Sequence, residues 1–295
     1  MERRICAITG ATGGIGAALA DEAVRRGFDL VLHGRSVSKL EAMKEEISQR
    51  HPTLDIALVV GDLGTAFGAE QVAGEISKVA PKLDLLINNA GVLLGGLPVS
   101  PDGIDMHTQV NLIAPYVLMQ RLKPALSEVK GSVINVASGS ARRVKTLSVR
   151  SLKKPTDTRK LFGAYAQSKL AVALITQTIA PDFLTDGIRI VAADPGPVKS
   201  GMTSGDGMPG LLKLLRPFLY ATPEKGAAKV FAALDSEARA DQSGGFYPGG
   251  KRRSLPAFAN QGHLADEILE FCDEQIERAN DVVPLARFRI SKKEA

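Results

Sequence analysis

The stretch TGATGGIG, from Thr9 to Gly16, decides the fold of this chain. It follows the short apolar run RICAIT and leads into IGAALADEAVRRG, whose apolar residues recur at helical spacing. Glycines between a strand and a helix let a ligand approach the helix N-terminus, where unpaired N–H groups and the helix dipole favour an anion. The stretch therefore predicts a strand–turn–helix unit that binds the pyrophosphate of a dinucleotide.

The alternation of strand and helix continues along the chain. Together with RICAIT, seven β-rich runs are present, the others being FDLVLHG, DIALVVGDL, LDLLINNAG, GSVINVAS, GIRIVAADPG and GGFYPGG. Helical segments such as SVSKLEAMKEEISQR and AEQVAGEISKVA lie between most of them. Because crossover connections are right-handed and cover both faces of a sheet, we predict an α/β protein. The expected fold is a single Rossmann domain over residues 1–295, with a doubly wound parallel sheet of about seven strands.

Composition agrees with one globular domain. With 295 residues, 44% of them hydrophobic, the chain can build one large core. It contains no run of 18 apolar residues, and MERRICAITG lacks the apolar core of a secretion signal, so we expect a cytoplasmic protein without a transmembrane segment. Cys6 and Cys272 fall in a predicted strand and a predicted helix, so we expect neither a disulfide framework nor a metal site.

The positive charge is concentrated in one segment. The whole chain has a net charge of +5, whereas residues 142–160 hold eight basic residues and one acidic residue, a net charge of +7. Nucleic-acid-binding proteins are typically basic over much of the fold and use aromatic platforms, whereas aromatic residues are 5% here and tryptophan is absent. We predict no nucleic-acid partner and interpret residues 139–160 as a basic insertion that attracts anionic ligands. A solvated, partly disordered loop is the alternative.

The residues after the second predicted strand indicate which dinucleotide is bound. An acidic residue there would bond the 2′-hydroxyl of the NAD ribose. This chain has His33-Gly34-Arg35-Ser36 instead. Because a guanidinium suits bidentate binding of a 2′-phosphate, we predict NADP(H) in preference to NAD(H). The alternative is that Arg35 is an ordinary exposed residue at a strand end.

The segment GAYAQSKLA, residues 163–171, places Tyr165 and Lys169 four positions apart in a predicted helix. Residues with this spacing share one helix face, so both head groups can reach one site. An ammonium about 5 Å away favours phenolate by roughly 3 kcal/mol, so we expect the pKa of Tyr165 to fall from about 10 towards 8. Such a phenol can give a proton to a carbonyl oxygen, which predicts acid–base chemistry at Tyr165.

Taken together, four ordered motifs resemble those of the short-chain dehydrogenase/reductase family. They are Thr9-Gly10-x-x-x-Gly14-Ile15-Gly16, Asn88-Asn89-Ala90-Gly91, Tyr165-x-x-x-Lys169 and Pro195-Gly196-x-Val198. The resemblance covers about residues 4–280 and implies an NADP(H)-dependent oxidoreductase that interconverts a carbonyl and an alcohol. Two details, the wording Ser168-Lys169-Leu170-Ala171 and a gap of 27 positions from Ser138 to Tyr165, are similar to carbonyl reductases and retinol-dehydrogenase-like members.

The resemblance implies roles for individual residues. Ser138 would bond the substrate oxygen, and Tyr165 would exchange a proton with it. Lys169 would hold the nicotinamide ribose, and Asn111 would steady a water that links the lysine to solvent. The cofactor-binding set that it implies is Gly10, Thr12, Gly13, Gly14, Ile15, Gly16, Arg35, Asp62, Leu63, Asn89, Ala90, Gly91, Tyr165, Lys169, Pro195, Gly196 and Val198. One departure is Ala137, which stands where many members have a second serine.

Two other functions stay open. Gly10, Gly13 and Gly16 also fit the TGxxGxxG turn of the longer, sugar-nucleotide epimerase and dehydratase branch. The Asn-Asn-Ala-Gly motif and the 99 residues after Gly196 argue against that branch. The third candidate is a protein that binds NADP without catalysing a reaction. Such a protein need not keep Asn111, Ser138, Tyr165 and Lys169 together, so the presence of all four argues against it.

Three regional expectations complete the prediction. Residues 200–222, which include GLLKLLRPFLY, are expected to form a lid over a lipophilic substrate pocket, with a plain amphipathic helix on the core as the alternative. Residues 284–295 are expected to form a flexible tail. Relatives often build a tetramer contact from the helices that hold Asn111 and Tyr165. Because a basic insertion nearby would obstruct that contact, a monomer or dimer is favoured.

Overall fold

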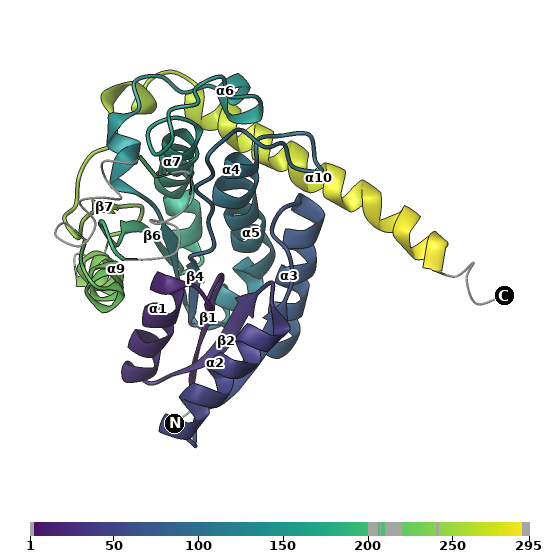
Figure 1. The fold of residues 1–295 in the computed structure, drawn as a ribbon, viewed down its shortest axis with the longest axis vertical. Helices are drawn as coiled ribbons and strands as arrows, with labels where there is room; N and C mark the ends of the chain where they lie inside the picture. Colours follow the sequence, from purple (N-terminus) through teal and green to yellow (C-terminus); the bar gives the residue numbers. More distant parts are fainter. Residues whose placement is uncertain (1–2, 200–205, 207, 210–219, 240–241, 291–295) are drawn as a thin grey trace.

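A parallel seven-stranded sheet forms the centre of the protein, seen here in a computed structural model (Figure 1) that describes residues 3–199, 206, 208–209, 220–239 and 242–290. The strand order is β3-β2-β1-β4-β5-β6-β7. The strands are β1 (Arg4–Ile8), β2 (Phe28–Gly34), β3 (Ile56–Val60), β4 (Leu85–Asn88), β5 (Ser132–Val136), β6 (Arg189–Asp194) and β7 (Phe246–Pro248). The predicted doubly wound fold is confirmed.

The strand order reverses between β1 and β4. In the register of the sheet, Cys6 of β1 lies opposite Leu30 of β2 on one side and opposite Leu85 of β4 on the other. Ligands of doubly wound sheets bind outside the carboxyl ends of the strands at such a switch point. The residues that follow β1 and β4 are therefore in position to form a binding site.

Helices cover both faces of the sheet (Figure 1). The first face carries α1 (Gly14–Arg25), α2 (Val37–Arg50) and α9 (Pro223–Arg239), and the opposite face carries α3 (Ala66–Val79), α5 (Ala114–Ser127) and α7 (Ala164–Thr185). Side chains alternate between the faces, so Cys6 and Ile8 pack with the first set of helices whereas Ala7 packs with the second. Both cysteines, Cys6 and Cys272, are free and buried. Two apolar cores thus hold the sheet rigidly between them.

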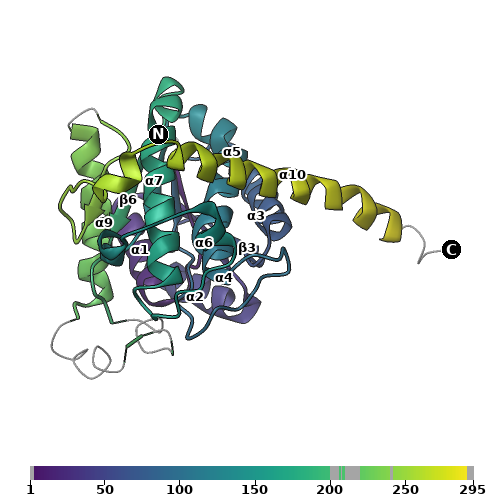
Figure 2. The same ribbon diagram turned by 90° about the horizontal axis from the view of Figure 1, so that it is seen from above.

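The long helix α10 (Leu264–Ile290) packs on α3, α5 and α7 and then extends away from the body of the protein (Figures 1 and 2). Ile268 and Phe271 bury their side chains against this face, and the Tyr116 hydroxyl donates a hydrogen bond of 2.7 Å to Asp273 Oδ1. The boundary predicted at residue 284 falls inside α10, because the helical backbone continues to Ile290. Residues 291–295 lie outside the described residues.

The basic insertion is folded onto the body rather than left as a loose loop. It contains the 3₁₀ helix η2 (Gly139–Arg143) and the short helix α6 (Val149–Lys153). Leu152 is 1% exposed, and its carbonyl accepts a hydrogen bond of 2.8 Å from Thr108 Oγ1. Lys153 forms an ion pair of 3.3 Å with Glu274 of α10. Burial of Leu152, its hydrogen bond to Thr108 and the ion pair of Lys153 together position this segment.

The described residues bear on the predicted lid and on the predicted absence of a transmembrane segment. Most of the expected lid, residues 200–222, lies outside them. Three residues of this segment that are described, Asp206, Met208 and Tyr220, line the large cavity analysed below. Within the described part of the chain, every helix is too short or too polar to cross a membrane.

Candidate active site

The ends of β1 and β4 are joined by side-chain hydrogen bonds. Thr9 Oγ1 accepts bonds from the backbone N–H groups of Asn89 and Ala90, both at 3.0 Å. In return, the Asn89 side-chain amide donates to the carbonyls of Thr9 at 2.8 Å and Gly10 at 3.1 Å. These bonds hold the glycine turn against the Asn-Asn-Ala-Gly motif at the switch point, which explains why threonine and asparagine are needed there.

The glycine turn fits a pyrophosphate. Helix α1 begins after Gly13, and no side chain caps its first turn. The Gly16 N–H donates to the Gly13 carbonyl at 2.6 Å, which leaves the N–H groups before it available to an anion. A Cβ at Gly13 would meet nothing closer than the Gly10 carbonyl at 3.9 Å, which leaves room for a ligand beside the turn. A Cβ at Gly16 would lie 2.3 Å from that same carbonyl. Gly16 therefore serves the close packing of helix on strand, whereas Gly13 faces open space.

A second feature of the turn points to a ligand. Among the described residues, the buried Asn89 Oδ1 atom has no hydrogen-bond partner, and Asn89 lines the cavity. An unpaired buried acceptor costs free energy, so it marks a position where a bound group with a donor is favourable. Together with the uncapped helix, this atom shows that the residues present fit a ligand that carries both an anion and a hydrogen-bond donor, as a nicotinamide dinucleotide does.

Arg35 and Asp62 lie at the adenosine end expected for the dinucleotide, after β2 and β3 respectively, and both line the cavity. Between them, His33 is 2% exposed and links the two strand ends to the glycine turn. The Gly10 N–H donates to His33 Nδ1 at 3.4 Å, and His33 Nε2 contacts the Gly61 carbonyl at 3.2 Å. Burial lowers the pKa of His33 to about 4, so the ring stays neutral and keeps both bonds at physiological pH.

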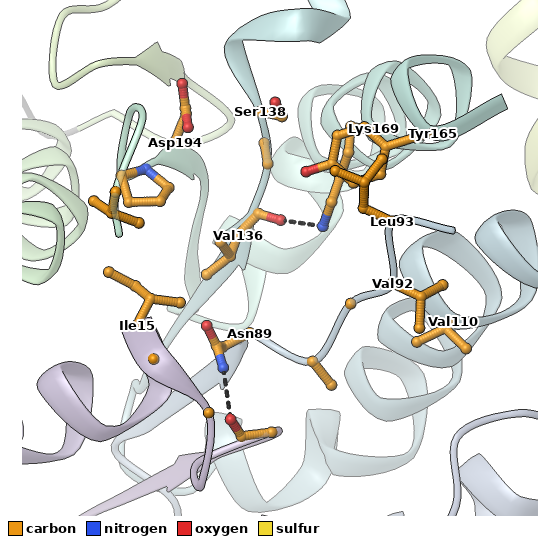
Figure 3. Close-up of a pocket in the computed structure, with 18 of the residues that line it drawn as sticks. Ile15, Asn89, Val92, Leu93, Val110, Val136, Ser138, Tyr165, Lys169 and Asp194 are labelled. Atoms are coloured by element: carbon orange, nitrogen blue, oxygen red, sulfur yellow. Dashed lines mark hydrogen bonds between the residues drawn. The ribbon is translucent and has the colours of Figure 1, made fainter. Parts of the chain in front are cut away.

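Tyr165, Lys169 and Ser138 border the same cavity, as Figure 3 shows. Helix α7 presents Tyr165 and Lys169, and Ser138 follows β5. Lys169 is buried, and its Nζ atom donates a hydrogen bond of 2.6 Å to the Val136 carbonyl (Figure 3). The three predicted residues are therefore brought together by the ends of a strand and a helix that pack side by side.

The prediction that the pKa of Tyr165 falls towards 8 is wrong for this structure. Burial raises the pKa of Tyr165 above its usual value, although the neighbouring Ser138 hydroxyl opposes the shift. The same burial lowers the pKa of Lys169 to about 8, and the nearby Asp194 carboxylate opposes that change. Burial disfavours the phenolate of Tyr165 and the ammonium of Lys169 alike. Its effect is larger here than the Coulomb attraction that the four-residue spacing of the pair suggested.

Asn111 lies behind the cavity rather than in its lining. It belongs to a π-helical turn, η1 (Gln109–Ile113), that precedes α5. Its side chain accepts from the Val92 N–H at 2.9 Å and donates at 3.0 Å to both the Val92 carbonyl and Ser168 Oγ. Asn111 thereby fixes the loop after β4 to α7. A π-helical turn is frequent at functional sites, because the extra residue redirects side chains locally.

Ser140 was not predicted from the sequence, yet it supports Ser138. Its backbone N–H donates to Ser138 Oγ at 3.3 Å, and its hydroxyl donates to the same atom at 3.0 Å. Ser138 Oγ thus accepts two hydrogen bonds and keeps its own proton for a ligand. Ala137, where many relatives have serine, is 3% exposed and belongs to the apolar core.

Asp194 is a second residue that sequence reasoning missed. It ends β6, is 9% exposed and lines the cavity. Its two carboxylate oxygens accept hydrogen bonds of 2.8 Å from the N–H groups of Gly139 and Gly196. Burial raises its pKa, and the charges of Lys169 and Lys229 act in the opposite direction. Asp194 therefore ties the turn after Ser138 to the Pro195-Gly196 loop and places a carboxylate near Tyr165 and Lys169 of α7.

His107, on the short helix α4 (Met106–Thr108), also lies beside the tyrosine. The His107 and Tyr165 rings meet edge to face with centroids 6.5 Å apart. The Leu94 N–H donates to His107 Nε2 at 3.0 Å, so the ring proton resides on Nδ1, 3.2 Å from Asp105 Oδ1. This chain of bonds holds the loop that follows Gly91. His107 belongs to no recognisable motif, so the sequence alone did not indicate it.

The far end of the cavity is apolar. Leu93, Met208 and the Tyr165 ring form one buried cluster, and Leu161 packs against it. The whole cavity measures about 960 Å³, near the upper end of the range for small-molecule sites. Of the predicted site residues, all line the cavity except Gly16, which packs behind the turn, and Asn111.

A glycine turn for a dinucleotide and a Ser138, Tyr165 and Lys169 centre in one cavity define the short-chain dehydrogenase/reductase class. The family model described as short chain dehydrogenase matches residues 4–207, and the chain belongs to this family. The family prediction is confirmed: the protein is an oxidoreductase that acts on alcohol or carbonyl groups with a nicotinamide cofactor.

Similar proteins support the retinol-dehydrogenase-like subgroup. Dehydrogenase/reductase SDR family member 13 of Bos taurus is 30% identical over 272 residues, which cover 90% of this chain and 71% of the relative. Retinol dehydrogenase 13 of Homo sapiens is 28% identical over 267 residues, covering 88% of this chain and 81% of the relative. The Pseudomonas aeruginosa RhlG/NADP active-site complex shares the fold, with a TM-score of 0.65 at 24% identity over 84% of this chain and 95% of that chain.

Proposed function

We propose that this protein is an NADP(H)-dependent oxidoreductase that interconverts a carbonyl and an alcohol on a lipophilic small molecule. The observation that carries the proposal is the single cavity in which the uncapped helix N-terminus, Ser138, Tyr165 and an apolar cluster meet. Tyr165 is the acid or base of the reaction, and Ser138, Lys169 and Asn111 are its partners.

The geometry suits reduction of a carbonyl. The bound dinucleotide supplies the hydride. Ser138 donates its remaining proton to the carbonyl oxygen as a hydrogen bond and thereby holds the oxygen in place. The raised pKa of Tyr165 keeps its phenol protonated at neutral pH, and that is the form that can protonate the oxygen as it gains charge. In oxidation the same tyrosine accepts the alcohol proton.

Lys169 and the residues of the turn orient the cofactor in this proposal. Asn89, Ala90 and Gly91 line the cavity between the two ends of the dinucleotide, and a Cβ at Gly91 would lie 3.4 Å from Lys169 Nζ. Lys169 is thus within reach of a ribose held against Gly91. Pro195, Gly196 and Val198 line the opposite wall, where the carboxamide would bind.

Preference for NADP(H) rests on Arg35. This exposed guanidinium lines the cavity at the end of β2, and within the described part of the chain it forms no ion pair. It is therefore available to bind a 2′-phosphate with two parallel hydrogen bonds. Ser36 does not compete for this position, because its hydroxyl caps α2 by accepting from the Lys39 N–H at 3.4 Å.

A lipophilic substrate is favoured by the apolar wall beside Tyr165. Leu93, Met208 and Leu161 pack with the Tyr165 ring in one apolar cluster. Relatives such as Retinol dehydrogenase 13 are named for a lipophilic alcohol. The cytoplasmic location and the monomeric or dimeric state predicted from the sequence stay predictions, as does the lid over residues 200–222.

The test is a panel of ketones, aldehydes and alcohols, assayed with NADPH or NADP⁺ and in parallel with NADH or NAD⁺. The proposal expects net consumption of NADPH with lipophilic carbonyl compounds. A sugar nucleotide that changes while the cofactor stays constant would instead identify an epimerase or dehydratase. Tight NADPH binding without turnover of any compound would favour the non-catalytic protein.

A further inference from the structure

Arg143 lines the cavity on the segment that follows Ser138. It is the last residue of η2, the turn that begins directly after Ser138. Its guanidinium carbon lies 5.4 Å from the centroid of the Phe162 ring, which also lines the cavity and stands three residues before Tyr165. Stacking on an aromatic face limits the directions that the guanidinium can take. An exposed cation thus lies in the wall of the cavity, on the same turn as Ser138.

The charge of Arg143 is not neutralised within the described residues. Other bases of the insertion have acidic partners: Arg159 pairs with Asp157 at 2.6 Å and Lys153 with Glu274 at 3.3 Å. In the part of the chain that the structure describes, no carboxylate lies within 4.0 Å of the Arg143 guanidinium. Asp206 also lines the cavity, but it packs beside Gly95 and has an interaction of its own.

The expected dinucleotide does not require this cation. The 2′-phosphate belongs at Arg35, after β2, and the pyrophosphate belongs at the N-terminus of α1. Arg143 follows β5 instead, in the turn that begins after Ser138, and it stacks on Phe162, the chain neighbour of Leu161, which packs against the apolar cluster. The ligand group nearest to it is therefore a part of the substrate.

We propose that Arg143 binds a carboxylate on the substrate, which is then a lipophilic carbonyl compound with an anionic end. The inference rests on the proposed carbonyl reduction and specifies its substrate class. A planar guanidinium forms two parallel hydrogen bonds with a carboxylate, and the ring beneath it lowers the entropy lost on binding. The apolar cluster would hold the chain between the carbonyl and the carboxylate.

The first test measures binding without turnover. Decanoate and its methyl ester are titrated into the NADPH complex of the parent protein, of Arg143→Gln and of Arg142→Gln, with NADPH fluorescence as the readout. Arg142 is the matched control, because it is exposed, carries the same charge and is not part of the cavity lining. We expect Arg143→Gln to weaken decanoate binding by about tenfold or more and the control to change it less than about twofold.

The second test uses turnover. A series of ω-oxo carboxylic acids of increasing length is compared with the matching methyl esters, by kcat/KM with NADPH. The proposal expects the free acid to exceed its ester by about tenfold or more at one chain length, and this ratio to fall to about one in Arg143→Gln. Arg143→Lys keeps the positive charge but lacks the two parallel N–H donors of a guanidinium, so it should retain part of the preference for the acid.

Three outcomes would overturn the inference: equal binding of acid and ester by the parent, equal losses in Arg142→Gln and Arg143→Gln, or weaker NADPH binding in Arg143→Gln alone. The last would assign Arg143 to the cofactor. If no carbonyl compound is reduced but decanoate binding still depends on Arg143, the proposed function fails while the carboxylate site stands. The two conclusions are therefore separable.

Discussion

In the proposed function, the two halves of the cavity recognise their ligands by different means. In the cofactor half, formed by the glycine turn and the ends of β1 to β4, backbone N–H groups and glycines would meet the ligand, and side chains such as Thr9 and Asn89 brace the backbone. In the substrate half, formed around Ser138, Tyr165 and Leu93, the side chains themselves would meet the ligand. A substitution in the cofactor half should therefore alter dinucleotide binding, whereas one in the substrate half should alter chemistry or substrate choice.

The largest expected effect separates the two halves at Tyr165. The variant Tyr165→Phe removes the proton donor and keeps the ring that packs with Leu93 and Met208. We expect kcat to fall by about 10²–10⁴-fold, the usual contribution of general acid–base catalysis, while the Kd of NADPH changes less than about twofold. Steady-state turnover and a fluorescence titration measure the two quantities. Wild-type turnover by this variant would refute the assigned role.

The next effect concerns the cofactor half alone. In Arg35→Asp a carboxylate replaces the guanidinium at the end of β2 and repels a 2′-phosphate. We expect the Kd of NADPH to rise by about 10- to 100-fold and NADH to become the preferred cofactor, with kcat largely kept. Lys39→Asp is the matched control, since Lys39 is exposed on α2 and is not part of the cavity lining. A parent enzyme that already prefers NADH would contradict the assignment.

In the proposed function Lys169 serves both halves, and its burial lowers the stability of the folded protein. Because burial lowers its pKa to about 8, folding releases a proton between about pH 8 and the unfolded value of 10.5. The stability of the protein should therefore rise with pH across that interval, and the whole cost is present below pH 8. It amounts to roughly 3 kcal/mol at most, because the bond to Val136 offsets part of it.

The variant Lys169→Met tests this cost. We expect it to lose activity and to melt at a higher temperature than the parent protein at pH 7, with the difference shrinking by pH 10. Thermal unfolding of the protein without cofactor at both pH values provides the measurement. A lower melting temperature at pH 7, or a difference that does not depend on pH, would show that the lysine is fully compensated in the folded state.

The smallest effect is expected at Asp194. Its negative charge raises the pKa of both Tyr165 and Lys169, so Asp194→Asn should lower both values. We expect the pH profile of kcat/KM to move towards lower pH by about 0.5–1 unit. Asp62→Asn is the control, because it removes the same charge at the adenosine end of the cavity. A profile that moves equally in both variants would show a general charge effect instead.

The same division explains what could be predicted from the sequence. Gly10 to Gly16 and the Tyr165–Lys169 pair act through short spacings, which are visible in one dimension and led to the correct fold and family. Asp194 and Ser140 act through contacts that arise when the ends of β5 and β6 come together in the fold. No spacing of residues in the sequence predicts these contacts. The pKa of Tyr165 was predicted with the wrong sign, because a helical spacing indicates a charge nearby but not the depth of burial.

Helix α10 has a consequence for synthesis of the protein on the ribosome. The face of α3, α5 and α7 is covered in part by Ile268 and Phe271, which are made long after α7 ends at Thr185. At a typical elongation rate of 5–20 residues per second, on the order of ten seconds pass between the emergence of α7 and that of α10. During that interval the nascent chain exposes an apolar surface that attracts chaperones or other nascent chains, and the arrival of α10 ends this exposure.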